Sequence, residues 1–329
     1  MGLIKRSFDF KNNDNIFYKD LKIMNKSSVF IITAGTLWGL MGLFVRKFTN
    51  GYGFTSGETS SIRLILSGII FFLLIAIKDF KLLKVKLKDF WVFVCLGFFS
   101  IYCMTNFYFK SMMSDTSISV SAILLYTAPI IVMVFSCVLF KERFTAKKLI
   151  SLILAFFGCV LVCSVDGAKV TVTGFIYGLL SGFAYASYSI FGKIAMKRGY
   201  FSYTISGYSF IIAGIFSLLL GKPHIILQKF ETLKLNLSLF VWVLAIALVT
   251  AILPFVFYTK GLEKTPAGKA SVMASVEPLV ATVCGLFLGE KITFSVILGI
   301  VGILSAIVIL NTGEKMPPDK NKTKEVAKI

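Results

Sequence analysis

Long apolar segments, each about the length needed to cross a lipid bilayer, follow one another along almost the whole chain. An α-helix rises about 1.5 Å per residue, so roughly 20 apolar residues span a hydrocarbon core about 30 Å thick. Hydrophobic residues make up 57% of the chain, more than a soluble core of this size would bury. We therefore predict an all-α integral membrane protein whose transmembrane helices cover residues 28–48, 58–78, 90–110, 117–140, 147–166, 173–194, 203–221, 239–261, 267–289 and 293–312.

The positive charges between these ten segments predict their orientation. If the polar segment 1–27 is cytoplasmic, the cytoplasmic segments hold 26 of the 35 Lys and Arg residues and the outside loops hold 8. Cytoplasmic loops of membrane proteins are enriched in Lys and Arg, so we expect both termini inside the cell and a location in the cytoplasmic membrane. A Lys-rich cytoplasmic tail over 313–329 follows the last span. The net charge of +19 then reflects topology, and we expect no nucleic-acid partner.

The sequence repeats itself at separations of 147 to 150 residues. An odd number of spans in each half makes the second half enter the membrane from the opposite side. We therefore predict two inverted five-helix repeats, over 28–166 and 173–312, an arrangement typical of secondary transporters that work by alternating access. The corresponding segments are Phe107-Tyr-Phe-Lys110 with Phe257-Tyr-Thr-Lys260, Tyr126-Thr-Ala-Pro129 with Ser275-Val-Glu-Pro278, and Glu142 with Glu290.

These motifs resemble those of the drug/metabolite transporter superfamily, of the EamA type with ten helices. The resemblance covers residues 28–312 and is carried by Arg63 in the second span and by a proline followed by a glutamate near the end of each half. The two spacings differ, because Pro129 and Glu142 are thirteen residues apart and Pro278 and Glu290 twelve, so we expect one helix end to be a residue shorter. The resemblance implies export or uptake of a small metabolite, such as an amino acid or a related solute. It does not fix the solute or the direction.

Glu277 is the only carboxylate deep inside a predicted span, and Pro278 follows it. A charge at a helix centre costs about 2.5–3.5 kcal/mol on insertion scales, so such a residue needs a partner, a water-filled cavity or a function. Proline has no N–H and should break the helix and free a carbonyl near Ala274. We expect Glu277 either to exchange a proton during transport or to hold helices together. Pro129 is the counterpart of Pro278, but Ala128 replaces the acid.

Further candidates are the polar and amphipathic side chains inside spans. Arg63 is the only cation well inside a span, and it either binds a substrate carboxylate or pairs with Glu58 or Glu277. Asn106 is the only amide away from span ends. Amphipathic aromatic residues suit a cavity that receives an amphipathic solute, although each could equally serve in packing. These aromatic candidates are Trp38, Tyr108, Tyr126, Tyr185, Tyr188 and Tyr258.

Other classes of protein lack support in the sequence. The six cysteines fall inside apolar segments without a CxxC pair, and His224 is the only histidine, so we expect neither a disulfide framework nor a metal site. No HExxH motif, P-loop or pair of intramembrane aspartates occurs, so we expect no enzyme and no cofactor. A channel or an uncoupled facilitator for small solutes remains the alternative to a coupled carrier. The sequence leaves the oligomeric state open.

Overall fold

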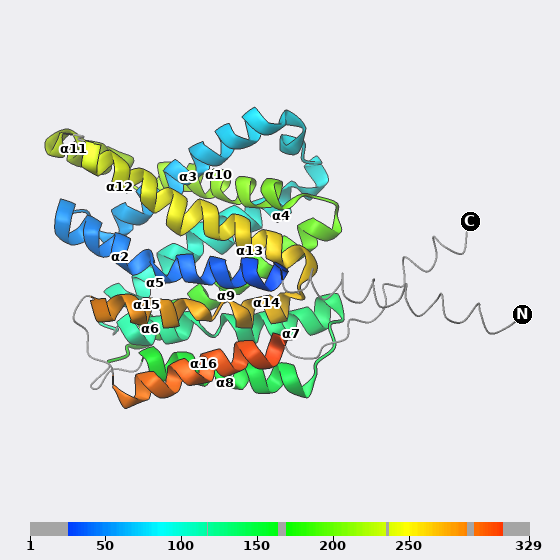
Figure 1. The fold of residues 1–329 in the computed structure, drawn as a ribbon. Coiled ribbons are helices and arrows are strands. Elements are labelled where there is room, and N and C mark those ends of the chain that lie inside the picture. Colours follow the sequence, from blue (N-terminus) through cyan, green and yellow to red (C-terminus); the bar gives the residue numbers. More distant parts are fainter. Residues whose placement is uncertain (1–25, 117, 164–168, 235–236, 288–292, 312–329) are drawn as a thin grey trace, which may run out of the picture.

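The described residues of the computed structural model are 26–116, 118–163, 169–234, 237–287 and 293–311. They form helices joined by short turns, with no strand among them (Figure 1). The all-α prediction is confirmed for this part of the chain. Most of the predicted segment 1–27, the whole of 313–329, and Glu290 lie outside the described residues.

Eight helical stretches of the described chain are long and apolar enough to cross a membrane. Each overlaps one of the ten predicted spans. Large apolar side chains on their outer faces, such as Leu73, Ile153 and Val301, are exposed, as expected of surfaces in contact with lipid. The eight stretches are Lys26–Gly51, Ser56–Ile77, Leu87–Met113, Val120–Phe140, Ala146–Cys163, Ser202–Leu220, Leu237–Lys264 and Phe294–Asn311.

Several of these stretches combine more than one element. The first continues from residue 26 into α2 (Met41–Arg46) and the π-helical η1 (Lys47–Gly51). The third joins η3 (Leu87–Asp89), α4 (Phe90–Val94), the π-helical η4 (Cys95–Cys103) and α5 (Met104–Met113). The stretch ending at Lys264 joins α12 (Leu237–Ala247), the π-helical η5 (Leu248–Ile252) and α13 (Leu253–Lys264). The other elements are α3 (Ser56–Lys78), η2 (Phe80–Leu83), α8 (Ala146–Cys163), α10 (Ser202–Leu220), α11 (Pro223–Leu233) and α16 (Phe294–Asn311).

The two remaining predicted spans are helical as well, but they are not among the eight. One of them is α9 (Val172–Lys197), which packs against α5, η4 and α13 (Figure 1). Its buried positions are mostly Gly, Ala and Ser, which let neighbouring backbones approach closely.

Two of the predicted spans are interrupted by a turn at the repeat-related prolines. The segments α6 (Ile118–Leu125) and α7 (Ala128–Phe140) meet at Tyr126-Thr127, and α14 (Ala267–Met273) and α15 (Val276–Phe287) meet at Ala274-Ser275. The carbonyl of Ala274, expected to be free because Pro278 has no N–H, instead accepts the backbone N–H of Glu277 at 3.1 Å.

Pairs of small residues pack against both interrupted helices. A Cβ at Gly35 would lie 2.9 Å from the carbonyl oxygen of Ala274, and a Cβ at Gly39 would lie 2.7 Å from that of Glu277. Gly182 makes the corresponding close approach to the other interruption, where a Cβ would lie 2.7 Å from the Leu124 carbonyl oxygen. The interruption in each half is thus packed against a helix of the other half.

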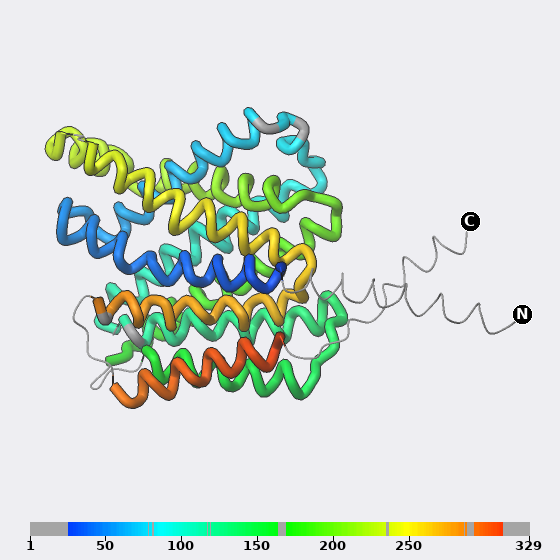
Figure 2. The backbone as a smooth tube through the Cα atoms, in the orientation of Figure 1, coloured from blue at the N-terminus to red at the C-terminus, as the bar shows by residue number. Residues whose placement is uncertain are grey.

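Helices that correspond in the two halves also pack on each other. α3 lies along α10, α8 lies along α16, and α7 contacts α14 (Figure 1). The first helix begins and α16 ends on the same side of the bundle, where the Ser28 hydroxyl donates to the Asn311 side chain at 2.8 Å (Figure 2). We call this side the terminus side.

Candidate functional site

A pocket lies at the centre of the bundle, between residues of both halves. The cavity has a volume of about 20 Å³, enough for about one water molecule. Walls come from the first helix and from α7, α9, α13 and α14, so neither half forms the pocket alone. The lining residues are Trp38, Ala128, Pro129, Val132, Tyr185, Ala186, Tyr188, Ser189, Tyr258, Ser271 and Ala274.

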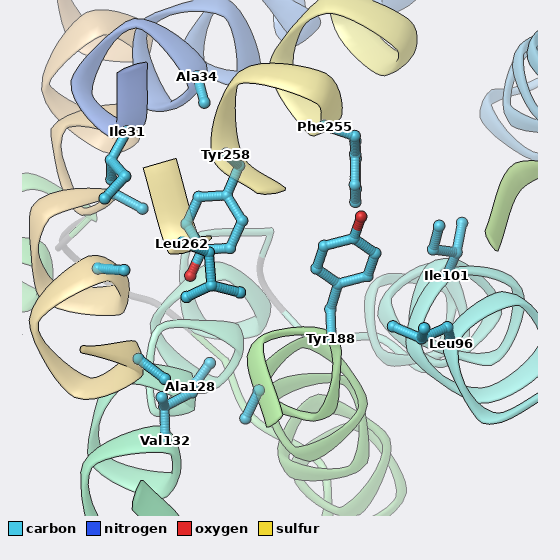
Figure 3. Close-up of a cluster of buried hydrophobic side chains, with 14 of the residues drawn as sticks. Ile31, Ala34, Leu96, Ile101, Ala128, Val132, Tyr188, Phe255, Tyr258 and Leu262 are labelled. Carbon is cyan, nitrogen blue, oxygen red and sulfur yellow. The ribbon is translucent and has the colours of Figure 1, made fainter. Parts of the chain in front are cut away.

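Aromatic rings form one wall of the pocket. The indole of Trp38 contacts Phe255 at 5.0 Å, Tyr258 at 5.3 Å and Tyr185 at 6.1 Å between ring centroids. Edge-to-face packing holds Tyr188 against Phe255 as well, at 4.9 Å (Figure 3). Four of the six aromatic candidates therefore meet in one place, although the chain positions of Trp38 and Tyr258 are 220 residues apart.

The tyrosine hydroxyls have different partners. Tyr258 and the Ser189 hydroxyl are hydrogen-bonded at 2.7 Å. Tyr188 turns away and bonds the Thr259 hydroxyl at 2.8 Å, which ties α9 to α13. Figure 3 shows the two rings side by side with their hydroxyls pointing in different directions. The Tyr188 hydroxyl thus serves helix packing, whereas the Tyr258–Ser189 pair lines the pocket.

Glu277 lies beside the pocket in the first turn of α15. Its carboxylate accepts a hydrogen bond from the Tyr185 hydroxyl at 3.2 Å, and the Tyr185 ring lines the pocket. The hydroxyl of Tyr126, at the interruption of the other half, also acts on this carboxylate. Glu277 is partly exposed, so the acid has hydroxyl neighbours and limited access to solvent.

Arg63 lies in α3, away from the pocket lining, and is only 4% exposed. Its Nη1 donates to the Thr250 carbonyl at 3.3 Å and approaches the Met41 sulfur at 3.5 Å, whereas its Nε has no partner among the described residues. Of the two ion pairs considered for Arg63, the one with Glu58 does not form, and Glu58 instead binds Lys229 at 2.6 Å. Arg63 and Glu277 act on each other electrostatically, but no described ion pair within 4.0 Å joins them.

The remaining candidates do not line the pocket. Asn106 donates to the carbonyl of Tyr102, one turn earlier in its own helix, at 2.9 Å. Tyr108 interacts electrostatically with Glu277. Its ring contacts the ring of Phe109. Both lie on α5, which packs mainly against α9.

The structure adds residues that the sequence did not single out. Ser189 and Ser271 line the pocket with hydroxyl groups, and serine is too common inside helices for a pattern to reveal them. Glu142, recognised only as part of a motif, accepts the backbone N–H of Ala267 at 2.8 Å and pairs with Lys148 at 3.5 Å. It thereby joins the end of α7 to the start of α14 on the terminus side.

The described residues contain no group of three or more His, Cys, Asp or Glu side chains that could hold a metal ion. All six cysteines are free.

Comparison with known proteins gives the same family for both halves. Residues 25–164 and 172–312 each match the EamA-like transporter family. An uncharacterized transporter of Archaeoglobus fulgidus is 27% identical over 289 residues, covering 88% of this chain and 97% of that protein. The uncharacterized transporter YwfM of Bacillus subtilis is also 27% identical, over 92% of this chain and 98% of its own length. A solved crystal structure superposes with a TM-score of 0.69 at 15% identity, over 86% of this chain and 96% of the other.

The apolar helices and these comparisons define a multi-pass membrane protein built for transport. Since the family matches most of its length, the chain belongs to the EamA-like transporter family.

Proposed function

We propose that this protein is a secondary transporter that moves a small metabolite across the cytoplasmic membrane by alternating access. In this proposal α9 and the α14–α15 pair complete a set of ten spans, the halves 28–166 and 173–312 are inverted repeats, and both termini are cytoplasmic. The solute binds at the central pocket, which must widen from this conformation to admit it, and Trp38 and the tyrosine rings contact its apolar part.

The packing between the halves supports this mechanism. The pocket lies where α7 of one half meets α14 of the other, and both helices belong to predicted spans that are interrupted by a turn. Interrupted helices at a repeat interface are where secondary transporters place their binding sites. A relative movement of the halves would change access to such a pocket without unfolding either one.

The surroundings of Glu277 support the proposal that transport is coupled to protons. It is a carboxylate in a helix interruption, hydrogen-bonded to a pocket tyrosine and partly exposed. A carboxylate that crosses between environments of different polarity does so at lower cost when it is protonated. Loading and unloading of one proton at Glu277 would therefore link the movement to the proton gradient.

The first experiment identifies the solute and separates a carrier from a channel. Comparing metabolites released by cells that lack or overproduce the protein names the solute. Purified protein in liposomes is then tested for counterflow of the labelled solute. A carrier shows trans-stimulation and saturation, whereas flux without trans-stimulation would refute alternating access.

The second experiment tests coupling. Glu277→Gln should abolish uptake driven by a pH gradient and leave counterflow of the solute measurable. Glu231→Gln, at an exposed position in α11, is the matched control and should behave as the parent. An unchanged response to the pH gradient in Glu277→Gln would remove Glu277 from the mechanism.

A further inference from the structure

One face of α9 carries a row of polar groups from the pocket to the terminus side. Tyr185, Ser189 and Lys193 follow at intervals of four residues, and side chains four apart in a helix lie one above the other. Tyr185 lies near the middle of α9, and Lys193 lies one turn from its end at Lys197. The row therefore crosses the half of the bundle between the pocket and the terminus side.

The pocket end of this row consists of two hydrogen-bonded pairs. Tyr185 donates to Glu277 at 3.2 Å, and Ser189 is bonded to Tyr258 at 2.7 Å. Both tyrosine rings contact Trp38, and their hydroxyls are near enough to interact electrostatically. Since Tyr185, Ser189 and Tyr258 all line the pocket, a water molecule there would find the polar partners it needs to bridge the pairs.

The other end of the row reaches charged groups on the terminus side. Lys193 is half-buried and interacts electrostatically with Glu142 and Glu263. Glu142 is held by the Ala267 N–H and by Lys148. Lys193 thus lies one helical turn beyond Ser189 on α9 and near ionisable groups on the terminus side.

The same region is closed to a solute. A Cβ at Gly268 in α14 would lie 2.7 Å from the sulfur of Met133 in α7, so the two helices are in tight contact. Ala195, Leu262 and Ala267 around this contact are fully buried. A metabolite cannot pass here in this conformation, whereas a proton needs only a chain of exchangeable hydrogens.

We propose that Tyr185, Tyr258, Ser189 and Lys193 form a proton relay that connects Glu277 with the terminus side while the solute route on that side is closed. The inference rests on the proposed coupling role of Glu277 and adds the route by which its proton enters or leaves. The relay uses the hydroxyl groups of Tyr185 and Tyr258, whereas the solute contacts the rings of the same residues.

Each transfer conserves charge along the row. For a proton leaving Glu277, the carboxyl hydrogen moves to Oη of Tyr185 while the hydrogen of Tyr185 passes to Oη of Tyr258, directly or through pocket water. The Tyr258 hydrogen moves to Oγ of Ser189, and the Ser189 hydrogen moves to Nζ of Lys193. Lys193 accepts it as a neutral amine, having first released a proton to water on the terminus side. One proton leaves Glu277 and one appears at the surface.

Other ionisable groups surround the two ends and must be considered in any pH dependence. Those near Glu277 are Tyr108 on α5, Tyr126 between α6 and α7, Cys159 and Cys163 on α8, Tyr185 on α9 and Arg63 on α3. Those near Lys193 are Glu142, Lys197 and Glu263. None of these groups other than Tyr185 bridges the interval between Glu277 and Lys193 along α9.

The test follows the protonation of Glu277 by time-resolved infrared spectroscopy of the purified full-length protein after a pH jump. The carboxyl band that disappears in Glu277→Gln reports this residue. Tyr258→Phe and Ser189→Ala each remove one relay hydroxyl. Tyr208→Phe and Ser187→Ala are the matched controls, because Tyr208 bonds the Leu83 carbonyl and Ser187 bonds Ser100 on the opposite side of α9.

We expect the relay variants to slow the response of the Glu277 band by about tenfold or more and the controls to keep the parental rate. Equal rates in all four variants would overturn the relay while leaving proton coupling by Glu277 intact. A band that does not respond to pH in the parent would refute both the relay and the proposed coupling. Retention of the band at equilibrium shows that a slow variant is folded.

Discussion

The close packing of the first helix on α15 can be tested with a single added methyl group. In Gly39→Ala, the new Cβ would lie 2.6 Å from Cβ of Val280 and 2.7 Å from the carbonyl oxygen of Glu277. Favourable contacts between carbon atoms need about 3.5–4.0 Å, so the helices must separate by roughly 1 Å. Overpacking of this kind typically costs about 1–3 kcal/mol.

A second glycine on the same transmembrane stretch provides the control. A Cβ at Gly42 would meet nothing within 4 Å, so Gly42→Ala adds the same atom without a clash. Alanine favours a helix over glycine by about 1 kcal/mol, and this gain applies to both variants. The difference in stability between them therefore isolates the clash, and we expect Gly39→Ala to be the less stable by about 1–3 kcal/mol.

Thermal unfolding in detergent measures this difference. Cys159 is only 1% exposed, so a thiol-reactive fluorescent dye reports its exposure as α8 unfolds once the five partly exposed cysteines have been replaced in all the proteins compared. Gly39→Ala should melt at a lower temperature than both Gly42→Ala and the parent. Equal melting temperatures for the two variants would show that the first helix and α15 are not in contact, and the described arrangement around Glu277 would be wrong.

Three further predictions concern the stability of variants at the charged residues Glu142, Arg63 and Glu58. Glu142→Gln should lower the melting temperature, because it leaves Lys148 buried without its partner, and adding Lys148→Met should recover most of the loss in the same dye assay. Arg63→Met should melt no lower than the parent, since Arg63 has no described ion pair to lose, and a large fall would reveal a structural pair. The Glu58–Lys229 pair is partly exposed, so a double-mutant cycle with Glu58→Gln and Lys229→Met should give a coupling of about 1 kcal/mol or less in thermal unfolding.

The helices were predictable from sequence because each apolar stretch carries its own signal. Lipid contact demands a run of about 20 apolar residues whatever the tertiary structure, and this local rule located eight spans of the described chain. The repeated proline motifs indicated helix breaks close to the turns at Tyr126-Thr127 and Ala274-Ser275, because the missing N–H of proline is also a local signal. The backbone partner of the Ala274 carbonyl was not predictable, because the turn re-forms its hydrogen bonds locally.

The site was only partly predictable because its contacts are distant in sequence. Trp38, Tyr185 and Tyr258 stood out as large amphipathic residues, and the pocket brings them together. Asn106 stood out equally but bonds its own helix. The partner of Glu58 is Lys229, 171 residues away in the short helix α11, and nothing in the local sequence pointed to it.

The two interrupted helices differ at one pair of equivalent positions, and this difference makes the two halves of the fold chemically unequal. Ala128 and Glu277 occupy equivalent positions in the repeats, yet Ala128 is 3% exposed and Glu277 is partly exposed. If the halves exchange conformations during alternating access, Glu277 takes up the more buried environment that Ala128 now has. A charged carboxylate loses hydration when it enters a more buried environment, whereas the protonated acid avoids most of this penalty. With an acid in one half and alanine in the other, the free energy of this exchange would depend on whether Glu277 carries a proton. With alanine at both positions it would not.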